Sequence, residues 1–195
     1  YGRAMSGVVN VVTKDGGPTF EGSTSFGYST FQTQNTDIFI GLDPNINNSN
    51  DIKFSFGGPL LGEKITFFTN IRSQDNKGHL NGYRLFSVND ISNFYSDDSL
   101  EWYSEKTGDK SYVPMNTGKN LSVLGKISLN LFKGIRISLL HSYSDDSWFG
   151  YDHGFKYNPD GRAGSYKETN YSAFQLNHMI SPKLFYELKL SVVDN

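Results

Sequence analysis

Hydrophobic and polar positions alternate with a period of two along most of the chain. The clearest run is 121–131, where Leu, Val, Gly and Ile occupy every second position and mainly Ser, Lys and Asn lie between them. Successive side chains of a strand point to opposite faces, so this run predicts a strand with one apolar and one polar face. The alternation recurs in 135–142 and 184–192 and, less regularly, in 20–28, 52–56, 65–72 and 171–180. Helical periodicity is not evident, and the sequence predicts an all-β protein.

The connections between the seven predicted strands alternate between short and long. Most of these strands are about 9–11 residues long, which suffices to cross a bilayer at a tilt near 45°, whereas globular strands are nearer 5–6 residues. In an antiparallel up-and-down meander, this alternation places every turn at one end and every loop at the other, as in outer-membrane barrels. The short links are 58–64, 132–134 and 181–183, and the long ones are 29–50, 75–119 and 145–168.

Composition removes several classes of function. Cysteine is absent, which excludes disulfides, thiolate metal sites and a cysteine nucleophile. The net charge is -2 and no basic stripe is present, so a nucleic-acid partner is not expected. The mean hydropathy of -0.48 is compatible with membrane strands, because only every second side chain of such a strand faces lipid. The chain begins at Tyr1 without a signal sequence, and we expect it to be an internal segment of a longer protein.

Pattern alone leaves two architectures open. A secreted or periplasmic β-sandwich also has strands with one apolar and one polar face. Long strands and segregated loops favour a membrane barrel. Seven strands cannot close as an even-numbered bacterial barrel, and the two open edges fit a fragment.

The opening segment, 1–17, carries a motif. It reads Tyr-Gly-Arg-Ala-Met-Ser-Gly-Val-Val-Asn-Val-Val-Thr-Lys-Asp-Gly-Gly. This segment resembles the C-terminal end of the plug domain of TonB-dependent receptors, where Tyr-Gly and a small-residue stretch precede Gly, paired Val/Ile residues around Asn, and Thr-Lys. By itself, the valine run also fits an ordinary buried strand. The matching residues besides the valines are Tyr1, Gly2, Gly7, Asn10, Thr13 and Lys14.

A second motif follows at the expected distance. Residues 54–60 read Phe-Ser-Phe-Gly-Gly-Pro-Leu and residues 64–68 read Lys-Ile-Thr-Phe-Phe. Together they resemble the first barrel hairpin of the same family, in which a Gly-Gly-Pro-Ile/Leu turn leads into Lys-Leu-Phe-Phe-Phe. Proline lacks an amide hydrogen and glycine permits a tight reversal, so this composition suits the end of a strand ladder.

The resemblance implies an architecture and a mechanism. Residues 1–17 would end the plug domain, and residues 18–195 would form the N-terminal part of an outer-membrane β-barrel, here about seven transmembrane strands of roughly 22. Such receptors bind an extracellular iron chelate, cofactor or oligosaccharide and import it with energy from the TonB complex. The TonB-contacting segment would lie outside this chain, and a surface lipoprotein is a possible partner. Within the plug end, Gly7 would allow close backbone packing and Asn10 would satisfy a buried polar group.

Aromatic residues of the long loops are the candidates for ligand contact, because their faces stack on sugars and on the rings of chelators. We select Trp102, Tyr103, Trp148 and Tyr151. The alternative is that these rings only pack the loops against one another. No histidine has metal-ligand spacing to another, and no nucleotide-binding or nucleophile motif is present. The sequence therefore predicts no catalytic residue, bound metal or cofactor. Two other functions stay open: a passive barrel or adhesin, and a soluble carbohydrate-binding sandwich.

Overall fold

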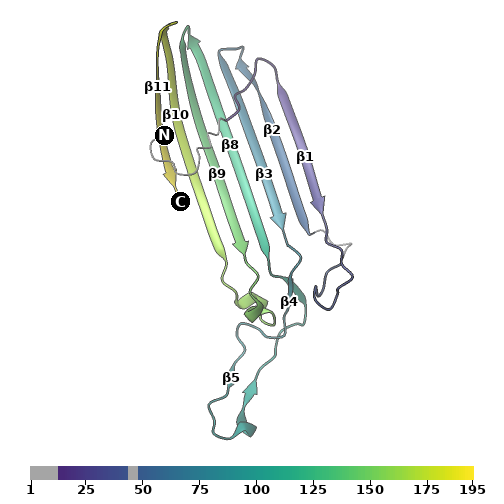
Figure 1. Ribbon diagram of the computed structural model, residues 1–195. Helices are drawn as coiled ribbons and strands as arrows, with labels where there is room; N and C mark the ends of the chain where they lie inside the picture. Colours follow the sequence, from purple (N-terminus) through teal and green to yellow (C-terminus); the bar gives the residue numbers. More distant parts are fainter. Residues whose placement is uncertain (1–12, 44–47) are drawn as a thin grey trace.

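The computed structural model describes residues 13–43 and 48–195, and their main feature is one seven-stranded antiparallel sheet (Figure 1). Each strand pairs with its neighbours along the chain, so the predicted all-β, up-and-down order is confirmed. Within the described residues the sheet is open, with β1 and β11 at its edges. The strands are β1 (Glu21–Ser29), β2 (Ser49–Leu61), β3 (Ile65–Asn76), β8 (Thr117–Phe132), β9 (Ile135–Phe149), β10 (Ser165–Ser181) and β11 (Leu184–Asp194).

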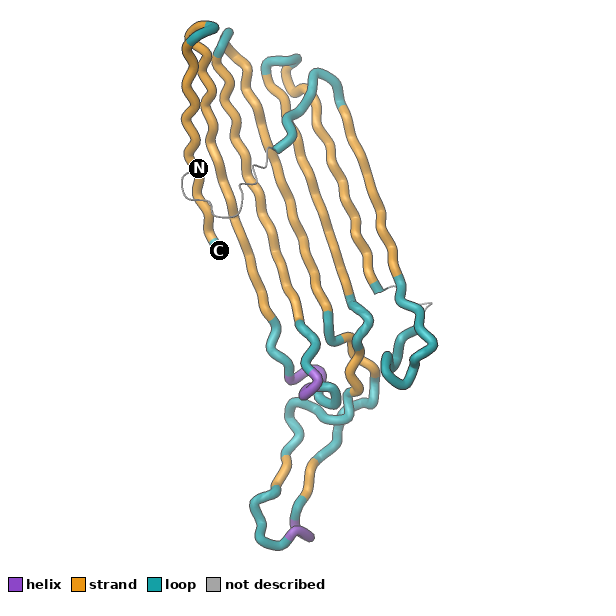
Figure 2. The backbone as a smooth tube through the Cα atoms, in the orientation of Figure 1, coloured by secondary structure: helices purple, strands orange, loops and turns teal. Residues whose placement is uncertain are grey.

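Short turns lie at one end of the sheet and long loops at the other, as the spacing predicts (Figure 2). The turns include Gly62 and Gly134, which have φ of +52° and +82°, a left-handed conformation that glycine adopts without steric strain. The described loop residues are 30–43 with Asn48, 77–116, and 150–164. They hold β4 (Asn81–Tyr83), β5 (Ser92–Asn93), β6 (Tyr103–Ser104), β7 (Tyr112–Pro114) and the short 3-10 helices η1 (Ser99–Glu101), η2 (His153–Phe155) and η3 (Pro159–Gly161).

Several strands are longer than the alternation predicts. β10 has 17 residues and β8 has 16, and the third loop is 150–164 rather than 145–168. The predicted turn at 58–64 is also too long, because β2 continues to Leu61. The alternation fades near the loops, where both faces carry polar residues such as Asp145 and Asp146. Backbone pairing with β8 and β10 nevertheless continues there, and pairing is what defines the strand.

The register aligns the apolar positions of all seven strands on one face, which we call the apolar face. One row across it runs from β3 to β11 through paired neighbours, and a second row lies two residues closer to the turns. Side chains on this face are largely uncovered, for example Phe54 at 39% and Leu190 at 58% exposure. The rows are Phe67, Ile127, Leu139, Phe174 and Leu190, and then Ile65, Leu129, Ile137, Leu176 and Leu188.

The opposite face, the polar face, carries hydrogen bonds and ion pairs between side chains. Arg72 donates two hydrogen bonds of 2.9 Å to the carboxylate of Asp51. At the other edge, Glu187 contacts Lys189 at 2.7 Å and accepts a hydrogen bond of 2.7 Å from Gln175. The two faces of the sheet therefore differ in chemistry over its whole width.

Very little of the chain forms a conventional core. Among the described side chains, Met115 and Pro159 are the apolar ones that are fully buried, and both lie in the loops. The described part of the chain also contains no helix with the length and apolarity needed to cross a membrane.

Candidate functional site

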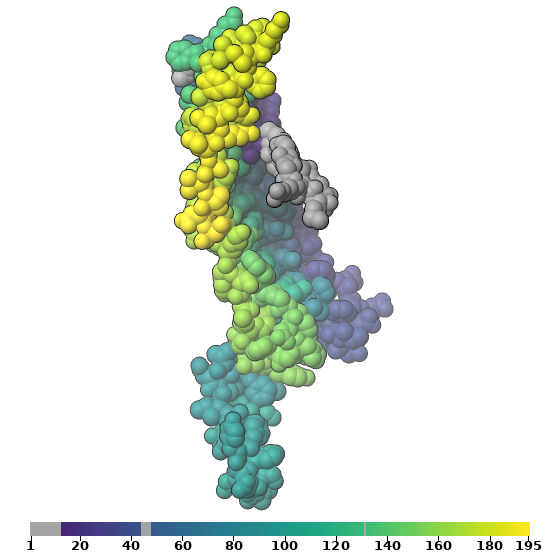
Figure 3. All heavy atoms as spheres, turned by 60° about the vertical axis from the view of Figure 1, so that its left-hand side comes forward, coloured from purple at the N-terminus to yellow at the C-terminus, as the bar shows by residue number. Residues whose placement is uncertain are grey.

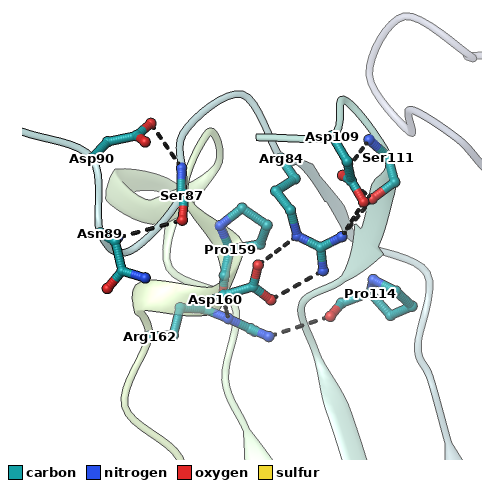
Figure 4. Close-up of polar contacts among 10 residues, drawn as sticks. All are labelled: Arg84, Ser87, Asn89, Asp90, Asp109, Ser111, Pro114, Pro159, Asp160 and Arg162. Carbon is teal, nitrogen blue, oxygen red and sulfur yellow. Dashed lines mark hydrogen bonds and ion pairs between the residues drawn. The ribbon is translucent and has the colours of Figure 1, made fainter. Parts of the chain in front are cut away.

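The loop end of the sheet is organised around Arg84, which follows β4 in the second loop (Figure 4). Its guanidinium donates to both carboxylate oxygens of Asp160 in the third loop, at 2.5 and 3.2 Å. It also donates to Asp109 at 2.9 Å and to the hydroxyl of Ser111 at 2.7 Å. The hydrogen bonds and charge of Asp160, with those of Asp109, raise the pKa of Arg84 above its ordinary value against partial desolvation. Arg84 thus joins the second and third loops.

Backbone contacts reinforce this junction. The amides of Tyr83 and Leu85 donate to the carbonyls of Lys156 and Tyr157, at 2.7 and 3.1 Å. Beneath them Gly82 packs so closely that an added Cβ would lie 2.6 Å from the sulfur of Met115. The same Cβ would lie 2.8 Å from the carbonyl oxygen of Lys156 in the third loop, so the small glycine allows the second and third loops to approach closely.

Arg162 forms a second connection, visible beside the first in Figure 4. Its guanidinium donates to three carbonyl oxygens, those of Pro159 at 2.9 Å, Gly150 at 3.1 Å and Pro114 at 3.2 Å. Burial lowers the pKa of Arg162, and the charge of Asp160 opposes that effect. These bonds join the backbone of the second loop, at Pro114, to that of the third loop, at Gly150 and Pro159.

The first loop is attached to the same cluster. Asn48 is buried and its amide donates to the carbonyl of Gly78 at 3.3 Å, while its oxygen accepts from Thr30 at 3.1 Å. The ring of His79 packs against Phe31 and Phe39, with centroids 5.1 and 5.9 Å away. All three loops therefore form one connected layer over the end of the sheet.

One hairpin, residues 87–107, projects beyond this layer (Figure 3). Asp90 closes its base by accepting hydrogen bonds from the amides of Ser87 and Thr107, at 2.9 and 3.0 Å, and from the hydroxyl of Thr107. The Thr107 hydroxyl is the main cause of the lowered pKa of Asp90. At the tip, Tyr95 and Leu100 are 96% and 91% exposed. This hairpin presents uncovered aromatic and aliphatic side chains away from the sheet.

The four aromatic residues selected from the sequence fall into two groups. Trp102 and Tyr103 belong to the projecting hairpin, where the indole nitrogen of Trp102 donates to the carbonyl of Ser96 at 2.8 Å. Trp148 was predicted to be a loop residue, and this is wrong, because it lies in β9 and pairs with Gly118 and Ser165. Tyr151 lies just after β9 and contacts His153 at 2.9 Å. The hairpin and the end of β9 lie apart (Figure 1), so the structure does not bring the two groups into one site.

The N-terminal segment 13–17 crosses the polar face near the turns (Figure 2). Thr13 accepts hydrogen bonds from the ammonium of Lys126, and Lys14 pairs with Glu21 at 3.2 Å. The other motif residues, Tyr1, Gly2, Gly7 and Asn10, lie outside the described residues. The predicted role of the motif stays a prediction, but its last residues do contact the polar face.

Three structural features escaped the sequence reading. Arg84 and Asp160 are 76 residues apart, and neither belongs to a recognisable pattern. His141 lies within β9 on the apolar face and hydrogen-bonds to Ser172 at 3.0 Å. Asp15 forms ion pairs with Lys126 and Arg136. The period-two pattern could have indicated which face of the sheet Lys126 and His141 occupy, but it could not have indicated their partners.

Comparison with known proteins adds no assignment. No family model matches the chain, and no curated protein or solved structure gives a match. Within the described residues, no group of three or more His, Asp or Glu side chains is arranged to hold a metal ion.

Proposed function

We propose that this chain is the N-terminal part of a TonB-dependent outer-membrane receptor, with its apolar face toward lipid and its polar face toward a plugged lumen. The observation that carries the proposal is the uncovered apolar face, which extends in register from β1 to β11. Burial of apolar surface contributes about 25 cal/mol per Å². A face of this width therefore requires a cover, either lipid or a second protein layer.

Lipid is the better cover for two reasons. The described residues supply no second layer over the apolar face, whereas the segment 13–17 approaches the polar face. The loops also gather at one end of the sheet, which in a barrel corresponds to turns on the periplasmic side and loops outside. A sandwich of two sheets gives no reason for this segregation.

In this proposal, the connected loop layer recognises an extracellular small molecule or oligosaccharide, and the TonB complex supplies the energy for import. Trp148 and Tyr151, at the rim of the sheet, would contact a ligand that enters the lumen. Trp102 and Tyr103 lie on the projecting hairpin and would meet a ligand, or a partner protein, farther out. The localisation that follows is the outer membrane.

Heat-modifiable migration of the full-length protein tests this proposal. Outer-membrane fractions would be run on a gel with and without boiling. A band that migrates faster before boiling indicates a closed barrel that resists detergent, and it would justify a screen for TonB-dependent uptake. A protein found in the soluble fraction, with no shift on boiling, would refute the membrane proposal and favour the soluble sandwich.

A further inference from the structure

Asp15 is the centre of a polar cluster that joins the N-terminal segment to the sheet. Its carboxylate lies 2.8 Å from the ammonium of Lys126 on β8 and 2.5 Å from the guanidinium of Arg136 on β9. It also accepts a hydrogen bond of 2.8 Å from the hydroxyl of Ser128. Three groups from two strands therefore converge on one carboxylate.

The residues in and next to this cluster on the sheet are unusually well covered for an open sheet. Ser128 is 1% exposed, Ser138 5% and Lys126 8%, and all three project from the polar face. Ser138 lies next to Ser128, with their hydroxyl oxygens 3.3 Å apart. Because Lys126 is so far removed from water, its charge needs the Asp15 carboxylate and the Thr13 oxygens as partners.

Backbone packing holds the same segment from its other side. A Cβ built on Gly16 would lie 2.1 Å from the carbonyl oxygen of Phe67 on β3. Only glycine fits at this approach. The segment is thus fixed by ion pairs to β8 and β9 and by close backbone contact to β3.

We propose that Asp15 is a positioning residue that anchors segment 13–17 to the polar face, so that this segment stays fixed on the sheet during transport. This inference rests on the proposed function, since it assigns the segment to the stationary part of the receptor. Charge-assisted hydrogen bonds in a partly buried site are about twice as strong as neutral ones. The bonds of Asp15 therefore supply attraction that holds the segment, whereas Gly16 only permits its close approach to β3.

Thiol labelling of purified full-length protein tests the anchor directly. The chain contains no cysteine, so Ser138→Cys on β9 introduces a single reactive thiol in this region. The control is Ser122→Cys, which lies on the polar face of the neighbouring strand β8. A maleimide, with the labelled peptide identified by mass spectrometry, should react slowly at position 138. Adding Asp15→Asn should raise that rate about tenfold, equal to ~1.4 kcal/mol of lost protection. Asp97→Asn, the same change on the exposed hairpin, should leave it unchanged.

Two results would overturn the anchor. One is a reaction at position 138 that Asp15→Asn does not accelerate, and the other is an equal acceleration at position 122, which would indicate general loosening of the sheet. This arm does not require transport, so it reports on the anchor even if the heat-modifiability experiment refutes the membrane proposal.

A second arm tests whether the segment is stationary in cells with and without TonB. With Asp15 present, labelling at position 138 should be equally slow in both strains. With Asp15→Asn, it should be faster in the strain that has TonB, because force then reaches an unanchored segment. A residue with only a structural role would give the same rate in both strains. TonB-dependent labelling in the presence of Asp15 would show that segment 13–17 moves and would refute the proposal.

Discussion

Replacement of single apolar-face residues by arginine distinguishes a lipid cover from a protein cover. Ile127 and Leu121 lie on the same face of β8 and are both 41% exposed in the sheet. The apolar stretch from Leu121 to Leu129 is about 26 Å along the strand at roughly 3.3 Å per residue. In the proposed barrel, at a tilt near 40°, this stretch would span roughly 20 Å along the membrane normal, and its midpoint is Gly125.

The expected penalties follow from these depths. Ile127 lies roughly 5 Å from the midpoint and Leu121 roughly 10 Å from it, toward the loops. The cross-strand neighbours of the two residues also differ, because Ile127 pairs with Phe67 and Leu139 whereas Leu121 pairs with polar residues. Arginine costs about 2–4 kcal/mol at the midplane and about 0–1 kcal/mol near the interface. We therefore expect Ile127→Arg to lower the free energy of unfolding by ~1–3 kcal/mol more than Leu121→Arg does.

Urea titration of the full-length protein refolded into phospholipid vesicles measures this difference, provided that the slope of free energy against urea is unchanged between variants. Ser122→Arg, on the polar face, should change stability less than Ile127→Arg. Equal losses of unfolding free energy at positions 121 and 127 would refute a penalty that depends on depth in the bilayer. Equal losses are expected under a uniform protein layer, because the two side chains are equally exposed in the sheet.

Three further outcomes are expected. Arg84→Ala should speed amide hydrogen exchange at the junction of the second and third loops, because it lowers the free energy of local opening there by roughly 1 kcal/mol. The effect is small because the ion pairs of Arg84 are partly exposed and correspondingly weak. Partial burial acts to raise the pKa of Asp15, but the bonds from the groups around it and their charge outweigh that effect and hold the pKa below 3.8. The stabilisation from Asp15 is therefore present above pH 3.8 and is lost only as the pH falls further. A dipyridyl disulfide that reacts with thiols in acid should then label the Ser138→Cys protein faster. Gly134→Ala should destabilise the refolded protein by more than ~1 kcal/mol, since its Cβ would lie 2.6 Å from the carbonyl oxygen of Met179, and Gly62→Ala, with nothing within 4 Å, should cost less in the same urea titration.

The sequence by itself determined the strands, their order and the ends at which turns and loops lie. These features are local, because side-chain alternation and turn composition depend on residues that are close in the chain. The two faces of each strand were also readable, and β8 shows them as predicted. The strand ends near the loops could not be predicted from the sequence. Asp145 and Trp148 extend β9 because their backbone pairs with other strands, and the hydrophobic pattern does not continue through them.

Only the tertiary structure decided which side chains meet. Register between strands aligned Phe67, Ile127 and Leu139 in one row, and a shift of one residue would have sent each to the opposite face. The contacts of Arg84 with Asp160 and of Asp15 with Lys126 join residues far apart in the chain. Such pairs leave no periodic trace in the sequence, because the partner of each charge is set by how the strands and loops come together.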